Sequence, residues 1–195
     1  METMKFSTNV EQLAHYRHLV TTADGQRILL RPLAPQDHDA LAVLMQSLRP
    51  EALQYFRTST PDAAILANWA ENTEMARVFP LGAFAGDTLV GNATLHLGGG
   101  ATRHIAEIRV FLAQEYRRRG IGTAMLKTQI EIARKLGLYQ LMAEIAESRP
   151  QVVHAFEHLD FERQCVLRDY LMTPDGDTLD LILMVKYLKR SSGDF

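Results

Sequence analysis

The stretch 106–126 holds the residues whose types and spacing could do chemistry. It reads AEIRVFLAQEYRRRGIGTAML, which predicts a strand, a short loop and the first turns of a helix. Gly120 and Gly122 fall where the helix begins, and a helix N-terminus exposes unpaired backbone N–H groups with a partial positive charge. Glycine lets a ligand approach that backbone closely, and the run 117–119 adds three arginines. This pattern predicts an anion site, usually for a phosphate or pyrophosphate.

Two familiar phosphate-binding loops do not fit this stretch. The Gly-x-x-x-x-Gly-Lys-Ser/Thr pattern is absent from the sequence. A third glycine at the spacing of the dinucleotide fold is also absent, and the expected order of elements differs from a doubly wound sheet. The arginine run could instead contact nucleic acid, but it has no interleaved aromatic residues, and the glycines favour a small phosphate ligand.

Glu107 is the second candidate, because it interrupts an otherwise apolar strand expected over 105–112. Side chains alternate along a strand, so Glu107 shares one face with Ile105, Arg109 and Phe111. A carboxylate with a raised pKa, or one acting through a water molecule, can serve as a general base. The alternative is a structural salt bridge between Glu107 and its same-face neighbour Arg109.

Other reactive side chains are explained more simply by structure. His154 and His158 lie four residues apart on one helix face, a metal-binding spacing, but no third ligand is nearby in sequence, so a surface pair is favoured. Cys165 lies in an expected strand without a basic partner in sequence, which favours a buried small apolar residue over an acyl-carrying nucleophile. Three aromatic residues either line an acceptor pocket or belong to a helix core: Tyr55, Phe56 and Trp69.

Hydrophobic periodicity and turn residues predict one α/β (α+β) domain, with a mixed, mostly antiparallel sheet of about seven strands and flanking helices. Hairpins are expected at 23–26, 86–87 and 174–176, each of which contains an Asp-Gly or Gly-Asp pair. Strands are expected over 17–22, 27–33, 81–85, 88–97, 105–112, 138–145, 163–172 and 178–187. Helices are expected from residue 35, over 50–56 and 60–69, from the glycine loop to Gly137, and over 150–159 behind a capping box at Ser148.

Composition limits the class of protein. The chain has 195 residues, is 47% hydrophobic and carries 21 Lys+Arg against 23 Asp+Glu, for a formal charge of −2. This balance disfavours general nucleic-acid binding, including an RNA-binding module. One cysteine allows no internal disulfide, and neither a signal peptide nor an apolar run of ~20 residues is present, so a cytoplasmic protein without membrane contact is expected. We divide the chain into an N-terminal extension with the first hairpin strand (1–26), one domain (27–190) and a tail (191–195).

The run Arg117-Arg118-Arg119-Gly120-Ile121-Gly122 resembles the Gln/Arg-x-x-Gly-x-Gly/Ala signature of the GCN5-related N-acetyltransferases (GNAT). The element order fits that fold over about 27–187. The resemblance implies acetyl-CoA as cosubstrate and no metal. Loop N–H groups would hold the pyrophosphate, and the backbone of 110–112 would pair with the pantetheine arm and the thioester carbonyl. The cofactor-binding residues would then be Val110, Phe111, Leu112, Arg117, Arg118, Arg119, Gly120, Ile121, Gly122 and Thr123.

A narrower resemblance points to the acetyltransferase arm of bacterial protein-lysine acetyltransferases. It rests on Ala106-Glu107 ahead of the arginine-rich loop and on three short segments near the N-terminus: Arg31-Pro32-Leu33, Pro35-Gln36-Asp37 and Ser47-Leu48-Arg49-Pro50-Glu51. In those enzymes a glutamate on this strand is the general base, and Glu107 matches it. A lysine amine, with a pKa near ~10.4, must lose its proton before it attacks a thioester.

The sequence also departs from the family pattern. Arg149 and Phe156 stand where many members have an asparagine and a proton-donating tyrosine, and Asp160 replaces the usual glycine before Phe161. Coenzyme A then leaves as a thiolate, or another residue supplies the proton; Tyr116, Tyr139 and His154 are candidates.

Three functions follow from these residues. The first is transfer of acetyl from acetyl-CoA to a primary amine, with a protein lysine ahead of a small-molecule amine. The second, kept open by Phe156, is a non-catalytic acetyl-CoA sensor, and the third, an RNA-binding module, is disfavoured by charge. The edge of the closing hairpin could also pair with a second copy of the chain to form a homodimer.

Overall fold

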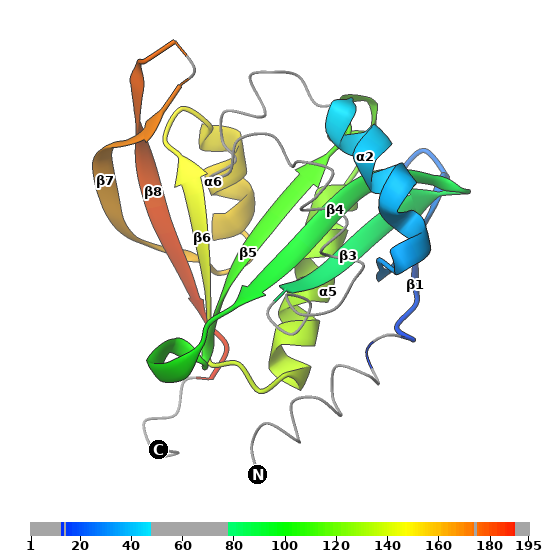
Figure 1. Cartoon of the computed structure of the whole chain (residues 1–195), viewed down its shortest axis with the longest axis horizontal. Coiled ribbons are helices and arrows are strands. Elements are labelled where there is room, and N and C mark those ends of the chain that lie inside the picture. Colours follow the sequence, from blue (N-terminus) through cyan, green and yellow to red (C-terminus); the bar gives the residue numbers. More distant parts are fainter. Residues whose placement is uncertain (1–12, 14, 48–77, 174, 190–195) are drawn as a thin grey trace.

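A computed structural model describes residues 13, 15–47, 78–173 and 175–189, and places eight strands in one sheet (Figure 1). The strand order is β1-β2-β3-β4-β5-β6-β8-β7, and only the β5–β6 pair is parallel. The strands are β1 His18–Thr21, β2 Arg27–Pro32, β3 Val78–Ala85, β4 Thr88–Leu97, β5 Ile105–Leu112, β6 Gln140–Ala146, β7 Glu162–Met172 and β8 Thr178–Tyr187. The expected mixed, mostly antiparallel sheet is confirmed. Each of the eight strand ranges expected from the sequence has a counterpart in it, so the expected total of about seven was close.

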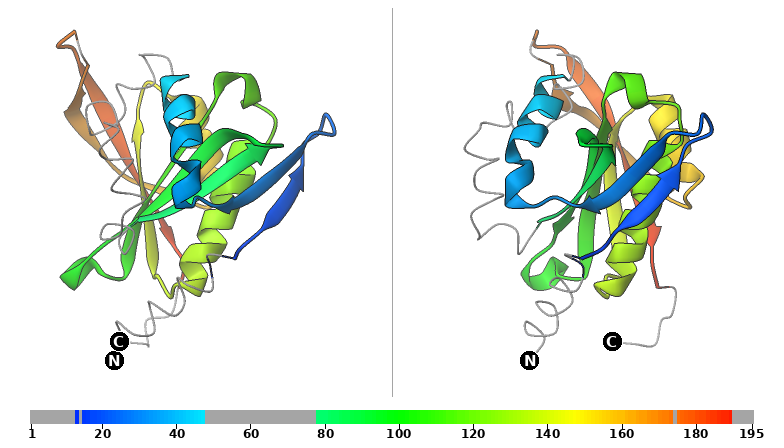
Figure 2. Two further views of the ribbon diagram at one scale, coloured as in Figure 1. Left: turned by 45° about the vertical axis from the view of Figure 1, so that its right-hand side comes forward. Right: turned by 90° about the vertical axis from the view of Figure 1, so that its right-hand side faces the viewer.

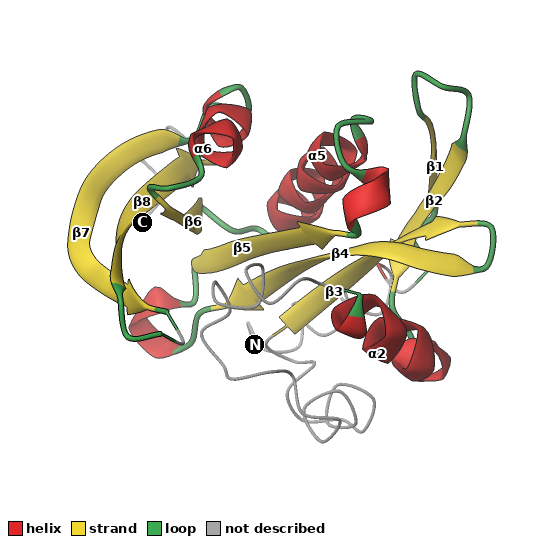
Figure 3. Ribbon diagram, turned by 90° about the horizontal axis from the view of Figure 1, so that it is seen from above, coloured by secondary structure: helices red, strands yellow, loops and turns green. Residues whose placement is uncertain are grey.

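Three α-helices lie in the part of the chain that the structure describes: α2 (His38–Gln46), α5 (Ile121–Lys135) and α6 (Pro150–Glu157). Helix α2 lies on one face of the sheet, and α5 and α6 lie on the other (Figure 3). Figure 2 shows the β1–β2 hairpin and the β7–β8 hairpin at opposite ends of the sheet. None of the described helices is long and apolar enough to span a membrane.

The three expected hairpins form, because their turns contain glycines that adopt a positive φ. The angle is +83° at Gly25, +59° at Gly86 and +90° at Gly176. Each turn joins two antiparallel strands: β1 to β2, β3 to β4 and β7 to β8. Only glycine adopts this left-handed conformation without steric cost, so the turn residues fix where each strand reverses.

Helix α5 forms where the sequence predicts it and packs against the middle of the sheet. Its apolar positions recur at helical spacing, and Met125, Ile132 and Ala133 are fully buried. Gln129 is buried among them, and its amide Nε2 donates to the backbone oxygens of Phe79 and Ala93, at 3.3 and 2.7 Å. These bonds fix the helix against β3 and β4.

An ion pair fixes the start of α2. Asp37 is buried, and its carboxylate accepts hydrogen bonds from both terminal nitrogens of Arg31, at 2.6 and 2.7 Å, and from the backbone N–H of Ala34. The Arg31 hydrogen bonds hold the pKa of the Asp37 carboxyl below its usual value. The guanidinium of Arg31 also stacks over the Phe84 ring, 3.9 Å from its centroid, so strand β2 and the turn before α2 are held together.

Strands β5 and β6 pair over only part of their length. The parallel ladder joins Ile105, Ala106 and Glu107 to Gln140, Leu141 and Met142, and then stops. Strand β6 pairs instead with β8 along its whole length. Beyond Glu107 the two strands therefore diverge and leave a gap between them.

Two local expectations are wrong. Ser148 does not cap α6; Arg149 occupies the N-cap position and no side-chain hydrogen bond caps it, because the helix begins at Pro150. Cys165 is exposed rather than buried, because β7 is the outermost strand of the sheet. The expected helices over 50–56 and 60–69, and the aromatic residues on them, lie outside the described residues.

Candidate active site

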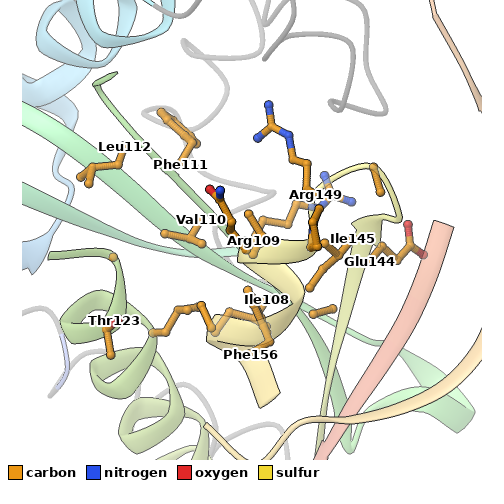
Figure 4. Close-up of a pocket in the computed structure, with 18 of the residues that line it drawn as sticks. Ile108, Arg109, Val110, Phe111, Leu112, Thr123, Glu144, Ile145, Arg149 and Phe156 are labelled. Carbon is orange, nitrogen blue, oxygen red and sulfur yellow. The ribbon is translucent and has the colours of Figure 1, made fainter. Parts of the chain in front are cut away.

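A pocket of about 870 Å³ opens where β5 and β6 diverge (Figure 4). It is lined by the end of β5, the diverging part of β6, the loop before α5, and the N-terminal part of α6. Nine of the residues singled out from the sequence line it: Glu107, Val110, Phe111, Leu112, Arg117, Arg118, Gly120, Gly122 and Thr123. The topology therefore brings the glycine loop and Glu107 to one cavity.

The N-terminus of α5 leaves backbone N–H groups toward this pocket. Gly120, the N-cap residue, has φ +81°, and no side-chain hydrogen bond caps the helix within the described chain. The first helical backbone bond runs from Ala124 N–H to Gly120 O, so the N–H groups of 121–123 remain for a ligand. A Cβ built on Gly122 would meet nothing within 4 Å, so its side of the helix is open space. Such a cradle fits a phosphate group.

The loop is held to β5 from one side. The Arg117 Nε donates to the Leu112 backbone oxygen at 3.0 Å, which fixes the loop against the end of the strand. Arg118 follows with φ +60°, an unusual value for a side chain other than glycine, and it lines the pocket. A strained backbone at a site of this kind indicates that the surrounding structure holds the loop in one shape.

Two residues of the signature point elsewhere. Arg119 forms an ion pair with Asp24 at 3.0 Å and a hydrogen bond with the Gln26 side chain, so it ties the loop to the β1–β2 hairpin. The pKa of Asp24 is lowered mainly by the hydrogen bond from the Thr22 hydroxyl, and to a smaller extent by the positive charge of Arg119. Ile121 is fully buried in the core, so only its backbone faces the loop.

Glu107 and Arg109 form a bidentate pair on β5. Arg109 Nε donates to Glu107 Oε1 at 2.6 Å, and Arg109 Nη2 donates to Oε2 at 2.9 Å. Both side chains line the pocket and both are partly exposed, at 35% for Arg109 and 21% for Glu107. The salt bridge that was the alternative role for Glu107 is thus present, and it lies inside the same cavity.

His96 is a neighbour of this pair that the sequence analysis missed. On strand β4 it is the register partner of Glu107, and Thr94 is the partner of Arg109. Its Nε2 lies 3.0 Å from the Thr94 hydroxyl. Burial, with the positive charge of Arg109, lowers the His96 pKa to about 4, so the imidazole is neutral at pH 7. The alternation of side chains along β4 could have predicted which face of the sheet His96 occupies. Only the register of the β4–β5 ladder places it beside Glu107.

Glu144 and Arg149 also line the pocket and were not predicted as site residues. Glu144 lies two residues beyond Met142, the register partner of Glu107, so it shares the face of Glu107 on the neighbouring strand. Arg149 stands at the N-cap of α6, and both residues are labelled in Figure 4. The sequence offered a signal for Arg149, because it stands where many family members have an asparagine. It offered no comparable signal for Glu144.

The proton-donor candidates named from the sequence all lie outside the pocket lining. Tyr116 contacts Arg119, Tyr139 packs edge-on against His104, and His154 is exposed beside Glu157. Phe156 does line the pocket. His154 and His158 contact each other on the surface of α6, and no group of three or more His, Cys, Asp or Glu side chains in the described chain is arranged to hold a metal ion.

Asp160 shows how the chain replaces a glycine. It adopts φ +59°, the left-handed conformation that glycine would favour there. Lys186 is buried, and its Nζ donates to the Leu159 backbone oxygen at 2.7 Å and to the Asp160 carboxylate at 3.1 Å. The ammonium group thereby satisfies the carbonyl at the end of α6 and holds the strained residue in place.

The profile of the acetyltransferase (GNAT) family matches residues 41–161. The chain belongs to the GNAT family. Enzymes of this family are acyl-CoA-dependent N-acetyltransferases, and acetyl-CoA is their cosubstrate. A search of curated proteins finds no significant match.

Solved GNAT structures share the fold at low sequence identity. The protein yncA of Salmonella typhimurium, solved with its cofactor acetyl-CoA, has a TM-score of 0.73 and 18% identity over 85% of this chain and 96% of its own. The GNAT domain of S. lividans PAT has a TM-score of 0.72 and 17% identity over 89% and 98%. A ribosomal-protein-alanine N-acetyltransferase from Brucella melitensis has a TM-score of 0.71 and 24% identity over 81% and 98%.

The residues of this GNAT chain fit acetyl-CoA. The open space at Gly122 and the free N–H groups of the first turn of α5 suit a pyrophosphate. The gap between β5 and β6 leaves strand backbone to which the amide groups of a pantetheine arm could bond. Arg117 and Arg118 supply positive charge at the same end.

Proposed function

We propose that this GNAT enzyme transfers an acetyl group from acetyl-CoA to a primary amine, with Glu107 as the general base. The observation that carries the proposal is the position of Glu107 at the last rung of the β5–β6 ladder, on the wall of the pocket. A carboxylate there would stand beside a thioester that reaches into the gap between the strands. We propose that residues 110–112 and 117–123 bind acetyl-CoA. Within this set, Arg119 would hold the loop in place through its ion pair with Asp24.

The residues divide the reaction between them. Acetyl-CoA supplies the activated acetyl group. Glu107 would accept the proton that the acceptor ammonium must lose, directly or through a water molecule, which frees the nitrogen lone pair for direct attack on the carbonyl carbon. Backbone N–H groups of β5 beyond Glu107 would stabilise the negative charge that develops on the carbonyl oxygen. The C–N bond forms, the nitrogen gives its second proton to solvent, and the C–S bond breaks. Coenzyme A leaves as a thiolate, since Phe156 cannot donate a proton, and Glu107 then returns its own proton to solvent.

We propose a protein lysine as the first acceptor and a small-molecule amine as the second. The support for a protein substrate is the narrower resemblance to protein-lysine acetyltransferases, carried by Ala106-Glu107 and the N-terminal segments. The fold neighbour from Brucella melitensis bears the name of an enzyme that acts on a ribosomal protein, which is consistent with a protein acceptor.

The experiment uses purified protein, acetyl-CoA and a deacetylated cell extract, with new acetyl-lysines mapped by mass spectrometry. The Glu107→Gln variant is compared with Glu131→Gln, a matched change on the exposed side of α5. We expect site-selective acetylation that is lost, by about 10²-fold or more, only in Glu107→Gln. Equal acetylation by both variants would exclude Glu107 as the base.

The acetyl-CoA sensor is the second candidate function. Two observations favour it: Phe156 stands in the pocket where a proton donor is common, and Arg109 holds both oxygens of Glu107. A sensor would bind acetyl-CoA but release no coenzyme A with the extract or with a panel of small amines. Coenzyme A release that depends on both an amine and Glu107 would exclude it.

A further inference from the structure

Arg109 uses only one edge of its guanidinium to hold Glu107. The bonds come from Nε and Nη2, at 2.6 and 2.9 Å. A guanidinium has a second edge, formed by Nη1 and the other hydrogen of Nη2, which matches a carboxylate in the same bidentate manner. Nη1 has no hydrogen-bond partner among the residues that the structure describes. Because Arg109 lines the pocket and is 35% exposed, this second edge is open to a ligand.

We propose that the second edge of Arg109 binds a carboxylate on the acceptor, so that the substrates are amines that carry a nearby negative charge. This inference rests on the proposed function and narrows its substrate class. The shared chemistry is a primary amine with a carboxylate beside it. It has two sources: a lysine next to an acidic residue in a protein, or a free amino acid.

The balance of charge around Glu107 supports this substrate class. The pocket lining contains four arginines and two glutamates. Arg117 and Arg118 lie on the loop that we assign to the pyrophosphate, which leaves Arg109, Arg149, Glu107 and Glu144 on β5, β6 and the start of α6. His96, the register partner of Glu107, adds no charge at pH 7. An acceptor with only an ammonium group would bring an unbalanced positive charge into this partly buried site. An acceptor with a carboxylate beside its amine brings no net charge.

The proposed arrangement places four charged groups, two from the acceptor and two from the protein, so that opposite charges are adjacent. The acceptor ammonium would lie beside the Glu107 carboxylate, and the acceptor carboxylate beside the Arg109 guanidinium, while Arg109 and Glu107 already contact each other. Each charge then has an opposite charge as its neighbour, and each contact is a charge-assisted hydrogen bond. Arginine is suited to this role because its planar group can bind two carboxylates at once, each through two N–H donors, whereas the three N–H donors of a lysine cannot form two bidentate pairs.

The test compares acceptors that differ only in the carboxylate. One pair is a short peptide with Lys-Glu against the same peptide with Lys-Gln, and the other is free alanine against alaninamide. We expect wild type to favour the carboxylate-bearing member of one pair by about tenfold in kcat/KM. The pair that shows the preference identifies the source. The ratio within a pair cancels any general loss of activity in a variant.

Three variants test whether Arg109 or Arg149 causes the preference for carboxylate-bearing acceptors. Arg109→Gln should abolish the preference, Arg109→Lys should retain only part of it, and Arg149→Gln should keep it. A wild type without preference, or a preference that survives in Arg109→Gln, overturns the inference and leaves the acetyltransferase function standing. If no acceptor is turned over, the proposed function fails. The preference is then measured as the ratio of Kd values within each acceptor pair, by calorimetry. No binding, or equal binding within both pairs, then overturns the inference as well.

Discussion

Gly122 offers a substitution with opposite effects on stability and on cosubstrate binding. It lies in the first turn of α5 with ordinary helical backbone, and an added Cβ would meet no atom within 4 Å. Replacing glycine by alanine in a helix restricts the unfolded chain and favours the folded one, so Gly122→Ala should stabilise the protein by about 0.5 kcal/mol. For a chain of this length that is a rise of about 1–2 °C in Tm.

The same methyl group should weaken acetyl-CoA binding. It would occupy the open space beside the N–H groups of the first turn, where we place the pyrophosphate. Loss of one hydrogen bond to a charged group costs about 1.5–3 kcal/mol, which is roughly 10- to 150-fold in Kd. Calorimetric titration with acetyl-CoA measures the affinity, and thermal unfolding without ligand measures the stability.

Gly99→Ala is the matched control. Gly99 also has open space around it, and its φ of −123° is compatible with alanine. It lies outside the pocket lining, so this variant should gain stability without losing affinity. A Gly122→Ala variant that binds acetyl-CoA like wild type would refute the assignment of the pyrophosphate to the start of α5.

Two further predictions concern β4. Both polar atoms of the Asn92 amide are buried and have no hydrogen-bond partner among the described residues. Asn92→Leu should therefore raise the free energy of unfolding by about 1 kcal/mol; a lower free energy of unfolding in urea titration would mean that the amide has a partner in solution. The His96 pKa is lowered from 6.5 to about 4, so its neutral form stabilises the fold above pH 6.5 and this stability is lost as the pH falls toward 4. Wild type should lose about 2 kcal/mol between pH 7 and pH 5 through this group, and His96→Gln should lack that part of the loss; equal losses in the two proteins would contradict the assignment.

Local sequence patterns predicted most strand bounds, the end of α5 and the hairpin turns. The bounds of β5, β4 and β8 agree with the expected strands, and Gly137 ends the α5 segment with φ +76°. Asp-Gly and Gly-Asp pairs located the hairpins because the backbone at those glycines needs a positive φ. The strand, loop and helix that form the proposed phosphate site are consecutive in the chain, so one stretch of sequence was enough to predict their arrangement.

What the sequence could not predict depends on contacts between distant segments. The register that brings His96 beside Glu107 is a property of the β4–β5 ladder. Arg119 points to Asp24, 95 residues away, rather than into the pocket. Cys165 is exposed because β8, the next strand in sequence, inserts between β6 and β7. No local pattern records the order of strands in a sheet.

The short β5–β6 ladder has a thermodynamic consequence for the whole molecule. Within the described residues, three residue pairs join β5 to β6 and thereby connect β1–β5 to β6, β8 and β7, whereas β6 and β8 share seven pairs. A ligand that bonds to the facing edges of β5 and β6 supplies the cross-sheet bonds that the protein lacks there. The resistance of the folded chain to unfolding and proteolysis then rises with the free concentration of acetyl-CoA, by RT ln(1 + [acetyl-CoA]/Kd). Cellular abundance of the enzyme would thereby follow the supply of its own cosubstrate.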